Sequence, residues 1–214
     1  GMKTLFVSGS DTDVGKTWVV RTLAALLSER GCSVQVVKPI ETGVRDGART
    51  DVQLSMGGCS DELVTGHTLY SFELPIAPVA AAESVGVSLE LASIVDRVRA
   101  LPEADWRIVE GAGSLAAPID RDGADWADFA MALEIERTIL VVEDRVGAIG
   151  QSRMTYAYAR GRGLRAGVWL NEIRNQDPAA RAGTREGIRS SGIPIWAVQD
   201  CGSRTADILE GEWL

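Results

Sequence analysis

A glycine-bounded loop near the N-terminus constrains the fold of this chain more than any other feature. Residues 9–17 read GSDTDVGKT and lie between an apolar run, residues 5–7, and a segment with apolar residues at helical spacing, residues 18–27. A strand, such a loop and a helix form a cradle for phosphate, because backbone N–H groups and the positive end of the helix dipole face the anion. Lys16 adds a positive charge and the Thr17 hydroxyl suits Mg²⁺. The sequence therefore predicts a nucleotide-phosphate site.

The spacing of this loop departs by one residue from the strict phosphate-loop pattern. Five residues separate Gly9 from Gly15, because Ser10 stands where the usual glycine would fall. The plain alternative is a glycine turn followed by a lysine and a threonine on the surface. That alternative leaves the flanking strand and helix unexplained, so the phosphate site remains the preferred interpretation.

The composition indicates one globular domain, residues 2–214, with 45% apolar and 24% charged residues. The net charge of −8 argues against a nucleic-acid partner, because a phosphate-backbone footprint needs a basic face. No apolar run approaches the roughly 20 residues that span a bilayer, so no membrane partner is expected. Cys32, Cys59 and Cys201 are odd in number and far apart, which argues against a disulfide framework and fits a cytoplasmic protein.

Apolar strands and amphipathic helices alternate along the chain. Strands are predicted over residues 3–8, 33–38, 69–72, 106–109, 138–142, 166–170 and 193–198. Helices are predicted from the phosphate loop to 29–30, over 51–56, after Ser88 as N-cap, and over 125–135, 148–160 and 178–189. Pro39 is expected to end the second strand. This alternation predicts an α/β fold with a doubly wound, mostly parallel sheet, like that of phosphate-loop NTPases, and with ligands at the carboxyl ends of the strands.

Several polar residues follow predicted strands, where this architecture places its site. Lys38 closes the strand expected beside the phosphate loop and could neutralise a transferring phosphoryl group, although a lysine there is also a common surface residue. Glu110 ends an apolar strand, where phosphate-loop enzymes place a carboxylate that faces the metal. Asp51 begins a helix and is equally consistent with an N-cap. Gly111 and Gly113 suit a close backbone approach or an ordinary turn, and Asn171 taken alone suits a turn.

Four ordered segments resemble the dethiobiotin synthetase family. They are the phosphate loop, KPIETG at 38–43, TDVQL at 50–54 and VEGAG at 109–113. The resemblance runs from about residue 5 to about residue 171 and fades towards the C-terminus. It implies an ATP-dependent cyclo-ligase of biotin biosynthesis. In that reaction 7,8-diaminononanoate and CO₂ give a carbamate, the carbamate attacks the γ-phosphate of ATP, and the second amine closes the ureido ring.

The resemblance also implies a role for each matching residue. Catalytic roles fall to Lys38, Lys16 and Thr12. ATP binding falls to Asp13, Val14, Gly15, Lys16, Thr17 and Asn171, and Mg²⁺ binding to Thr17, Asp51 and Glu110. Substrate binding falls to Thr12, Lys38, Thr42, Gly111, Gly147 and Ala148. In the family the segment at 146–150 comes from the partner subunit, so a homodimer is expected.

Some positions depart from the family pattern. Ser114 replaces a glycine that commonly follows Gly-Ala-Gly, and residues 76–79 lack the Ser and His often found around that proline. Residues 146–150 lack the Asn-His often found at their end. The departures affect recognition of the substrate tail more than they affect phosphoryl transfer.

Two other classes of protein share a phosphate loop of this kind. The first alternative is a nucleotide-dependent switch that resembles the partition and septum-site ATPases. Those proteins begin the loop with Lys-Gly-Gly, where this chain has Gly9-Ser10-Asp11. They also tend to carry a membrane- or DNA-binding surface, which the acidic balance of this chain disfavours. The second alternative, a cobyrinate-type amide ligase, would need an added glutaminase domain.

Overall fold

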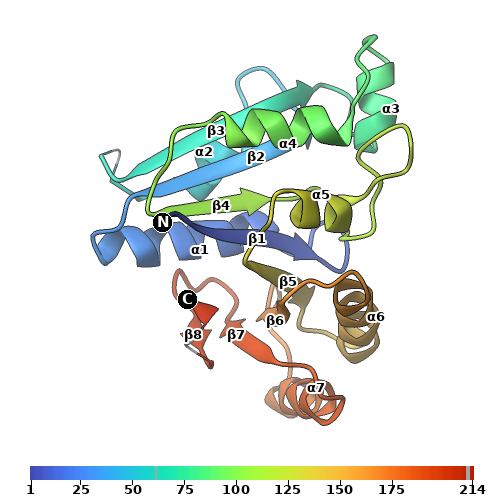
Figure 1. Ribbon diagram of the computed structural model, residues 1–214. Helices are drawn as coiled ribbons and strands as arrows, with labels where there is room; N and C mark the ends of the chain where they lie inside the picture. The colour runs from blue at the N-terminus through green and yellow to red at the C-terminus, as the bar shows by residue number, and fades with distance from the viewer. Residues whose placement is uncertain (61, 211–212) are drawn as a thin grey trace.

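A central sheet of eight strands lies between two layers of helices in the computed structural model, which describes residues 1–60, 62–210 and 213–214 (Figure 1). The strands are Lys3–Gly9 (β1), Val34–Thr42 (β2), Val64–Phe72 (β3), Trp106–Glu110 (β4), Arg137–Glu143 (β5), Ala166–Asn171 (β6), Ile195–Gln199 (β7) and Asp207–Ile208 (β8). The helices are Lys16–Glu29 (α1), Asp51–Ser55 (α2), Pro78–Glu83 (α3), Leu91–Arg99 (α4), Trp126–Ala132 (α5), Ala148–Gly161 (α6) and Pro178–Ser190 (α7).

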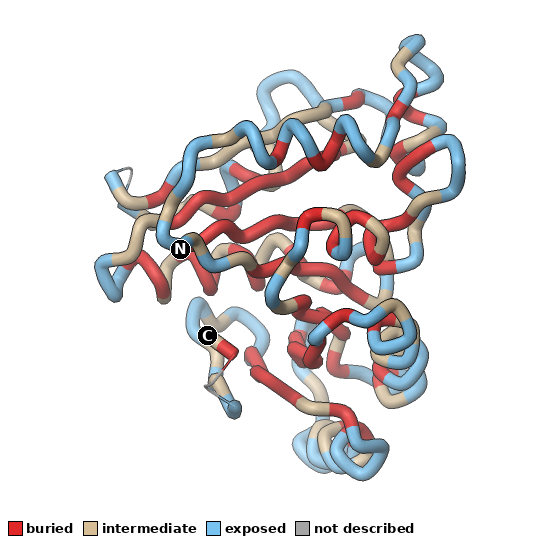
Figure 2. Tube along the Cα trace, viewed as in Figure 1, coloured by how far each residue is buried: buried red, intermediate tan, exposed pale blue. Residues whose placement is uncertain are grey.

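The strand order is β3-β2-β4-β1-β5-β6-β7-β8, and every neighbouring pair is parallel except β7 with β8. Parallel strands need crossover helices, and these cover both faces of the sheet. The central strands are therefore buried on both faces and appear as continuous buried segments in Figure 2. The predicted doubly wound α/β fold is confirmed.

Two hydrophobic cores lie on opposite faces of the sheet. On one face, α1 and α2 pack with Trp213 near the C-terminus, and the Trp213 ring stacks on Trp196 with 5.1 Å between ring centroids. On the other face, α3 to α7 cover a larger core, which includes an aromatic cluster of Phe6, Trp126 and Phe129. Trp213 therefore belongs to the same hydrophobic core as α1, the helix that follows the phosphate loop.

No helix in the part of the chain that the structure describes is long and apolar enough to cross a membrane.

The register of the sheet brings the carboxyl ends of β1, β2 and β4 to one edge. Val7 on β1 pairs with Glu110, and Val37 on β2 pairs with Val109. Lys38 and Glu110, the next residues on their strands, are therefore adjacent in the sheet. The loop after β4 is tied to β1, since Gly111 N donates to Val7 O at 3.0 Å. Side chains from three strands can thus converge beside the phosphate loop.

Pro39 does not end the second strand, contrary to the sequence-based expectation. β2 continues to Thr42 and stays paired with β3, where Lys38 pairs with Thr68 and Ile40 with Tyr70. Pairing with β4 stops at Val37. The distal part of β2 therefore has a neighbour on one side only, and proline is tolerated where one side of a strand is unpaired.

Besides the end of β2, the clearest differences from the predicted boundaries are in β3, β7, α4 and α5. β3 begins at Val64 rather than at residue 69, and β7 covers Ile195–Gln199. α4 begins at Leu91 with Glu90, not Ser88, at the N-cap position, and Asp120 Oδ2 accepts from Leu91 N at 3.1 Å. α5 ends at Ala132, short of residue 135, and Glu134 adopts a φ of 58°. A left-handed residue at that place stops the helical hydrogen-bond ladder.

Candidate active site

The phosphate loop is held by backbone contacts at both ends. Ser10 N donates to Val141 O at 3.0 Å on the neighbouring strand β5. At the other end Gly15 adopts φ 90° and ψ 30°, and α1 begins at Lys16. A left-handed conformation costs glycine little, so the chain can turn sharply from the loop into the helix. The first N–H groups of α1 are consequently available to an anion at this end of the helix.

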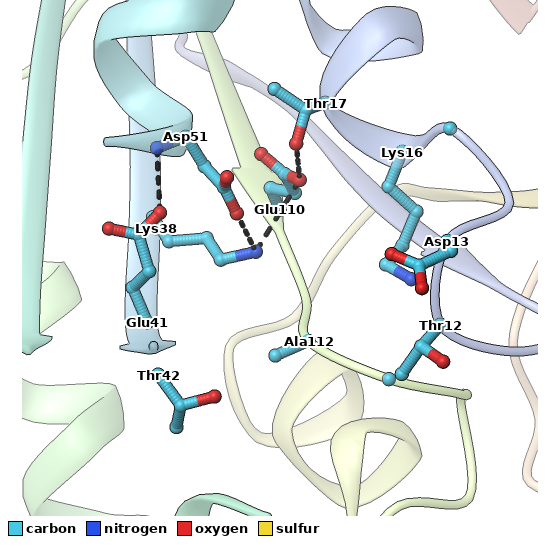
Figure 3. Close-up of a pocket in the computed structure, with 12 residues that line it drawn as sticks. Thr12, Asp13, Lys16, Thr17, Lys38, Glu41, Thr42, Asp51, Glu110 and Ala112 are labelled. Carbon is cyan, nitrogen blue, oxygen red and sulfur yellow. Dashed lines mark hydrogen bonds and ion pairs between the residues drawn. The ribbon is translucent and has the colours of Figure 1, made fainter. Parts of the chain in front are cut away.

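A cavity of about 310 Å³ opens beside this loop (Figure 3). Its lining comes from the phosphate loop and the start of α1, from β2, from α2, and from the end of β4 with the segment after it, which lie far apart in the sequence. Its lining residues are Thr12, Asp13, Gly15, Lys16, Thr17, Lys38, Glu41, Thr42, Asp51, Glu110, Ala112 and Gly113. Most of the residues that the sequence nominated for phosphate, metal and substrate therefore lie around one cavity.

Lys38 lies at the centre of a polar network in this cavity. Its Nζ is 2.9 Å from Asp51 Oδ2 and 3.4 Å from Glu110 Oε1, and it donates to Gly111 O at 2.9 Å. Thr17 Oγ1 donates to Glu110 Oε1 at 2.6 Å. The Lys38 side chain is only 5% exposed, so the alternative of a solvated surface lysine is wrong. The network joins the helix that follows the phosphate loop to β2, β4 and α2 through side chains.

The two ammonium groups of the cavity have different electrostatic environments. Burial, followed by the charge of Lys38, lowers the pKa of Lys16 to about 8. Burial also disfavours the charged form of Lys38, but the neighbouring Glu110 and Asp51 carboxylates outweigh it and raise the pKa of Lys38. Lys38 is therefore the more firmly protonated of the two. The chain has only three lysines, and these are two of them.

Oxygen atoms around Lys38 form a set of donors that suits Mg²⁺. The Thr17 hydroxyl and the Asp51 and Glu110 carboxylates come from three different elements and meet in one network. Glu110 Oε2 is buried and has no hydrogen-bond partner. Within the described residues, no group of three His, Cys, Asp or Glu side chains could hold a metal by itself. Two carboxylates and a hydroxyl fit Mg²⁺, which commonly takes few protein ligands and completes its shell with phosphates and water.

Some nominated residues lie outside this cavity. Asn171 is buried at the end of β6, and its Nδ2 donates to Val14 O at 3.2 Å, which places both residues on the other side of the phosphate loop. Gly111 contributes the carbonyl that accepts from Lys38. Gly147 and Ala148 begin α6 and do not line the cavity of their own chain.

Two lining residues were not nominated from the sequence, namely Glu41 and Ala112. Glu41 is 6% exposed, and its Oε1 accepts from Asp51 N at 2.6 Å. Burial raises the pKa of Glu41 to about 7. The sequence offered one indication of Glu41, namely an acidic residue three positions after Lys38. An acidic residue near the end of a strand is common, so this indication alone could not assign it to the site.

Solved structures with the same fold include nucleotide-binding proteins. FtsY from Mycoplasma mycoides superposes with a TM-score of 0.61 at 14% identity, covering 98% of this chain and 65% of that one. The septum site-determining protein MinD from Pyrococcus horikoshii, solved with Mg-ADP, gives a TM-score of 0.52 at 18% identity, covering 94% and 82%. At these identities the likeness shows the fold alone.

Sequence relatives narrow the assignment. An AAA domain family model matches residues 3–198. ATP-dependent dethiobiotin synthetases from Parafrankia sp., Halalkalibacterium halodurans and Mycolicibacterium gilvum are 39%, 33% and 34% identical to the chain. The alignments cover 76%, 88% and 100% of this chain and 68%, 80% and 98% of those proteins.

The fold and the phosphate loop define a phosphate-loop nucleoside triphosphatase. Within that class, the chain belongs to the ATP-dependent dethiobiotin synthetase family.

Proposed function

We propose that the chain is an ATP-dependent cyclo-ligase that carboxylates 7,8-diaminononanoate with CO₂ and closes the ureido ring of dethiobiotin. The names of the relatives support this activity. The observation that carries it here is the cavity beside the phosphate loop, where two buried ammonium groups and three oxygen donors meet. Phosphoryl transfer is catalysed mainly by positioning and charge neutralisation, and the cavity supplies groups for both.

The reaction consists of one addition followed by two displacements. One amine of the substrate adds to CO₂ and loses a proton, giving a carbamate. A carbamate oxygen then attacks the γ-phosphorus, ADP leaves, and a carbamic-phosphoric anhydride forms. The second amine attacks the carbonyl carbon, phosphate leaves with the C–O bond electrons, and a proton is released.

Each side chain has a role that follows from its place around the cavity. The phosphate-loop N–H groups, from Asp13 to Thr17, and the Lys16 ammonium would bind the phosphates of ATP. Lys38 would balance the charge of the carbamate and of the transferring phosphoryl group. Thr12 and Thr42 would hydrogen-bond the diamine and the carboxylates of the substrate, and Gly111 would allow a close backbone approach.

Asn171 lies on the opposite side of the phosphate loop from Lys38 and would read the adenine base with its two-sided amide. Val14, whose carbonyl accepts from that amide, would keep Asn171 aligned with the loop. A cytoplasmic setting fits the three free cysteines, Cys32, Cys59 and Cys201.

Phosphate release tests the activity directly. We expect release from MgATP to require both 7,8-diaminononanoate and bicarbonate, because the carbamate is the attacking group. The measurement is phosphate production with each substrate omitted in turn, together with detection of the ureido product. Strong hydrolysis with neither substrate, stimulated by a protein, lipid or DNA partner, would instead favour the nucleotide-dependent switch.

Thr17, Asp51 and Glu110 would hold Mg²⁺, which supplies neutralisation of the β- and γ-phosphate oxygens. We expect Glu110→Gln to fold and to need a higher Mg²⁺ concentration for half-maximal activity, because the amide removes the charge of one ligand. Glu136→Gln, just before β5 and at the end of the sheet opposite the cavity, is the control. An unchanged Mg²⁺ titration of Glu110→Gln would remove Glu110 from the metal site.

A homodimer would bring the loop before α6 to the partner's substrate. Two exposed apolar side chains support an interface there, because Val146, just before α6, is 88% exposed and Met154, midway along α6, is 70% exposed. We expect light scattering to give the mass of a dimer, and Met154→Glu to weaken both association and activity. Leu209→Glu, at an exposed apolar residue near the C-terminus, is the control. A monomer with full activity would exclude a partner contribution from Gly147 and Ala148.

A further inference from the structure

The proposed metal ligand Asp51 is the first residue of a very short helix. α2 has five residues, from Asp51 to Ser55. Isolated helices of this length are unstable, because nucleation fixes several residues for each hydrogen bond gained. The direction of the Asp51 side chain must therefore be set by contacts between α2 and the rest of the protein.

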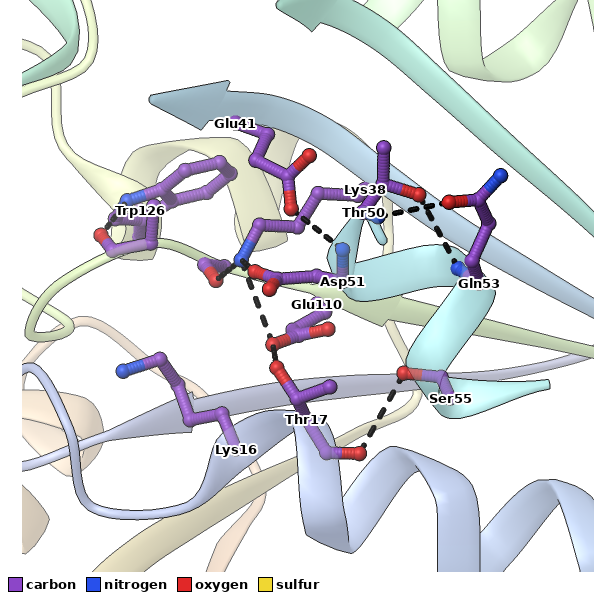
Figure 4. A network of polar contacts seen from close by, with 12 residues as sticks. Lys16, Thr17, Lys38, Glu41, Thr50, Asp51, Gln53, Ser55, Glu110 and Trp126 are labelled. Atoms are coloured by element: carbon purple, nitrogen blue, oxygen red, sulfur yellow. Dashed lines mark hydrogen bonds and ion pairs between the residues drawn. The ribbon is translucent and has the colours of Figure 1, made fainter. Parts of the chain in front are cut away.

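The N-terminus of α2 has two kinds of polar contact (Figure 4). A capping box joins Thr50 and Gln53, with Gln53 N donating to Thr50 Oγ1 at 3.2 Å and Thr50 N donating to Gln53 Oε1 at 2.9 Å. This box stabilises the first turn but does not connect it to the sheet. The backbone of this turn is connected to the sheet by Glu41, whose Oε1 accepts from Asp51 N at 2.6 Å. The next contact along the helix, from Ser55 Oγ to Thr17 O, is longer at 3.4 Å.

Glu41 is itself held rigidly. It lies on β2, where it pairs with Ser71 of β3, and it is 6% exposed. Its second carboxylate oxygen, Oε2, is buried without a hydrogen-bond partner. Burying a carboxyl group with an unpaired oxygen lowers the stability of the fold. A residue with this cost is more readily explained by a role in positioning α2 than by a role in stability.

β2 consequently contacts Asp51 at two atoms. Lys38 Nζ lies 2.9 Å from the side-chain oxygen Oδ2, and Glu41 Oε1 lies 2.6 Å from the backbone nitrogen. Contacts at the backbone and at the side chain of one residue fix both the position of its Cα and the direction of its carboxylate. Lys38 alone would fix only the carboxylate, which could follow the ammonium if α2 shifted.

We propose that Glu41 is a positioning residue, which anchors the first turn of α2 to β2 and so holds the Asp51 carboxylate towards Thr17 and Glu110. The inference rests on the proposed function only in taking Asp51 as a Mg²⁺ ligand. Residues that orient a metal ligand typically change metal affinity or activity about 10- to 100-fold when they are replaced.

Two substitutions distinguish the effect of the hydrogen bond to Asp51 N–H from the effect of the volume of the Glu41 side chain. Glu41→Met keeps a similar volume and removes the acceptor, whereas Glu41→Gln keeps an acceptor oxygen for Asp51 N–H. Glu41→Ala is a second variant without an acceptor, for use if the methionine disturbs folding. Glu73→Met, at an exposed position just after the neighbouring strand β3, is the matched control. Circular dichroism verifies the fold of each variant.

Hydrogen exchange and metal binding provide the two readouts. In the nucleotide-free protein, we expect Glu41→Met to speed exchange of the α2 amides about tenfold or more, with Glu41→Gln and Glu73→Met close to the wild type. With ADP present, we expect Mn²⁺ affinity, measured by electron paramagnetic resonance of free Mn²⁺, to fall about 10- to 100-fold in Glu41→Met and to recover largely in Glu41→Gln.

An Asp51→Asn variant distinguishes failure of this inference from failure of the proposed metal site. If Asp51→Asn weakens Mn²⁺ binding but Glu41→Met does not, the positioning role is wrong while the ligand assignment stands. If Asp51→Asn leaves Mn²⁺ affinity unchanged, the ligand assignment fails, and the role inferred for Glu41 fails with it. Equal losses in Glu41→Gln and Glu41→Met would also overturn the inference, because an acceptor alone would then not restore the position of α2.

Discussion

We expect Lys38→Met to lower turnover by about 10²–10³-fold with diamine, bicarbonate and MgATP saturating, because it removes one preorganised charge from the reacting groups. The ammonium is buried beside the phosphate loop, where Asp51 and Glu110 keep it protonated. A positive charge is most effective where negative charge accumulates, on the carbamate and on the equatorial phosphate oxygens. The measurement is kcat from phosphate release under saturating conditions.

The same substitution should also reduce stability, because the structure makes Lys38 a buried member of an ion-pair network. Removing one partner of a buried pair typically costs about 3–5 kcal/mol. The lower end is expected here, since the Asp51 side chain is 34% exposed and can be solvated. Mg²⁺ with ADP should restore part of the lost melting temperature by supplying a new cation to the two carboxylates.

Lys3→Met is the control for both effects of Lys38→Met. Lys3 is exposed at the start of β1, and its Nζ lies 4.9 Å from the centre of the Trp106 ring. Neither turnover nor melting temperature should change much in this variant, because an exposed cation–π contact contributes only about 0.5–1 kcal/mol. Wild-type turnover in Lys38→Met would show that Lys38 stabilises the fold without taking part in catalysis.

Gly15→Ala should weaken binding of Mg²⁺ with ATP or ADP by about 10²-fold or more, because the phosphate loop has no room for a methyl group. A Cβ at this position would lie 2.0 Å from Asn171 Nδ2. Asn171 is 2% exposed and bonded to Val14 O, so its displacement breaks a buried hydrogen bond. A shifted loop would misalign the N–H groups that face the phosphates, and each hydrogen bond to a charged group contributes about 1.5–3 kcal/mol, or roughly 10- to 100-fold in affinity. Isothermal titration with MgADP measures the effect.

Gly31→Ala separates backbone strain from steric collision. Gly31 has a φ of +81°, close to the +90° of Gly15, but a Cβ there would meet no atom within 4 Å. Alanine should therefore cost about 1–2 kcal/mol of stability at Gly31 and leave MgADP affinity unchanged. Equal affinity losses in the two variants would indicate that strain in the fold, rather than crowding against Asn171, controls nucleotide binding.

The sequence predicted the central strands well because they are buried on both faces and therefore read as continuous apolar runs. β3 was only partly predicted, since it is half-exposed over most of its length and its first half contains Gly66 and His67. The start of α4 depends on Asp120, a partner 29 residues away that local capping rules do not include. The end of α5 depends on a positive φ at Glu134, where no glycine marks it.

The candidate site was predictable where chemistry coincides with the ends of strands. Lys38 and Glu110 could be nominated on that ground, and the structure brings both to the cavity. Glu41 could not be nominated in this way, because its role depends on a contact with Asp51, ten residues further along the chain. That contact forms only when the loop between them folds back and places α2 beside β2. The burial of Lys38 could not be predicted either, because a lysine at a strand end is ordinarily solvated. The residues that surround its ammonium, Asp51, Glu110 and Gly111, come from distant parts of the chain.

The position of β1 in the sheet has an evolutionary consequence. β2 and β4, which carry Lys38 and Glu110, lie on one side of β1, whereas β6, which ends at Asn171, lies on the other. Under the proposed assignments, each subunit recognises its own acceptor substrate and the base of its own nucleotide with opposite halves of its sheet. Mutations in the loops after β6 and β7 could then change the preferred nucleotide while the acceptor chemistry is conserved. The two specificities of such an enzyme can diverge independently among its relatives.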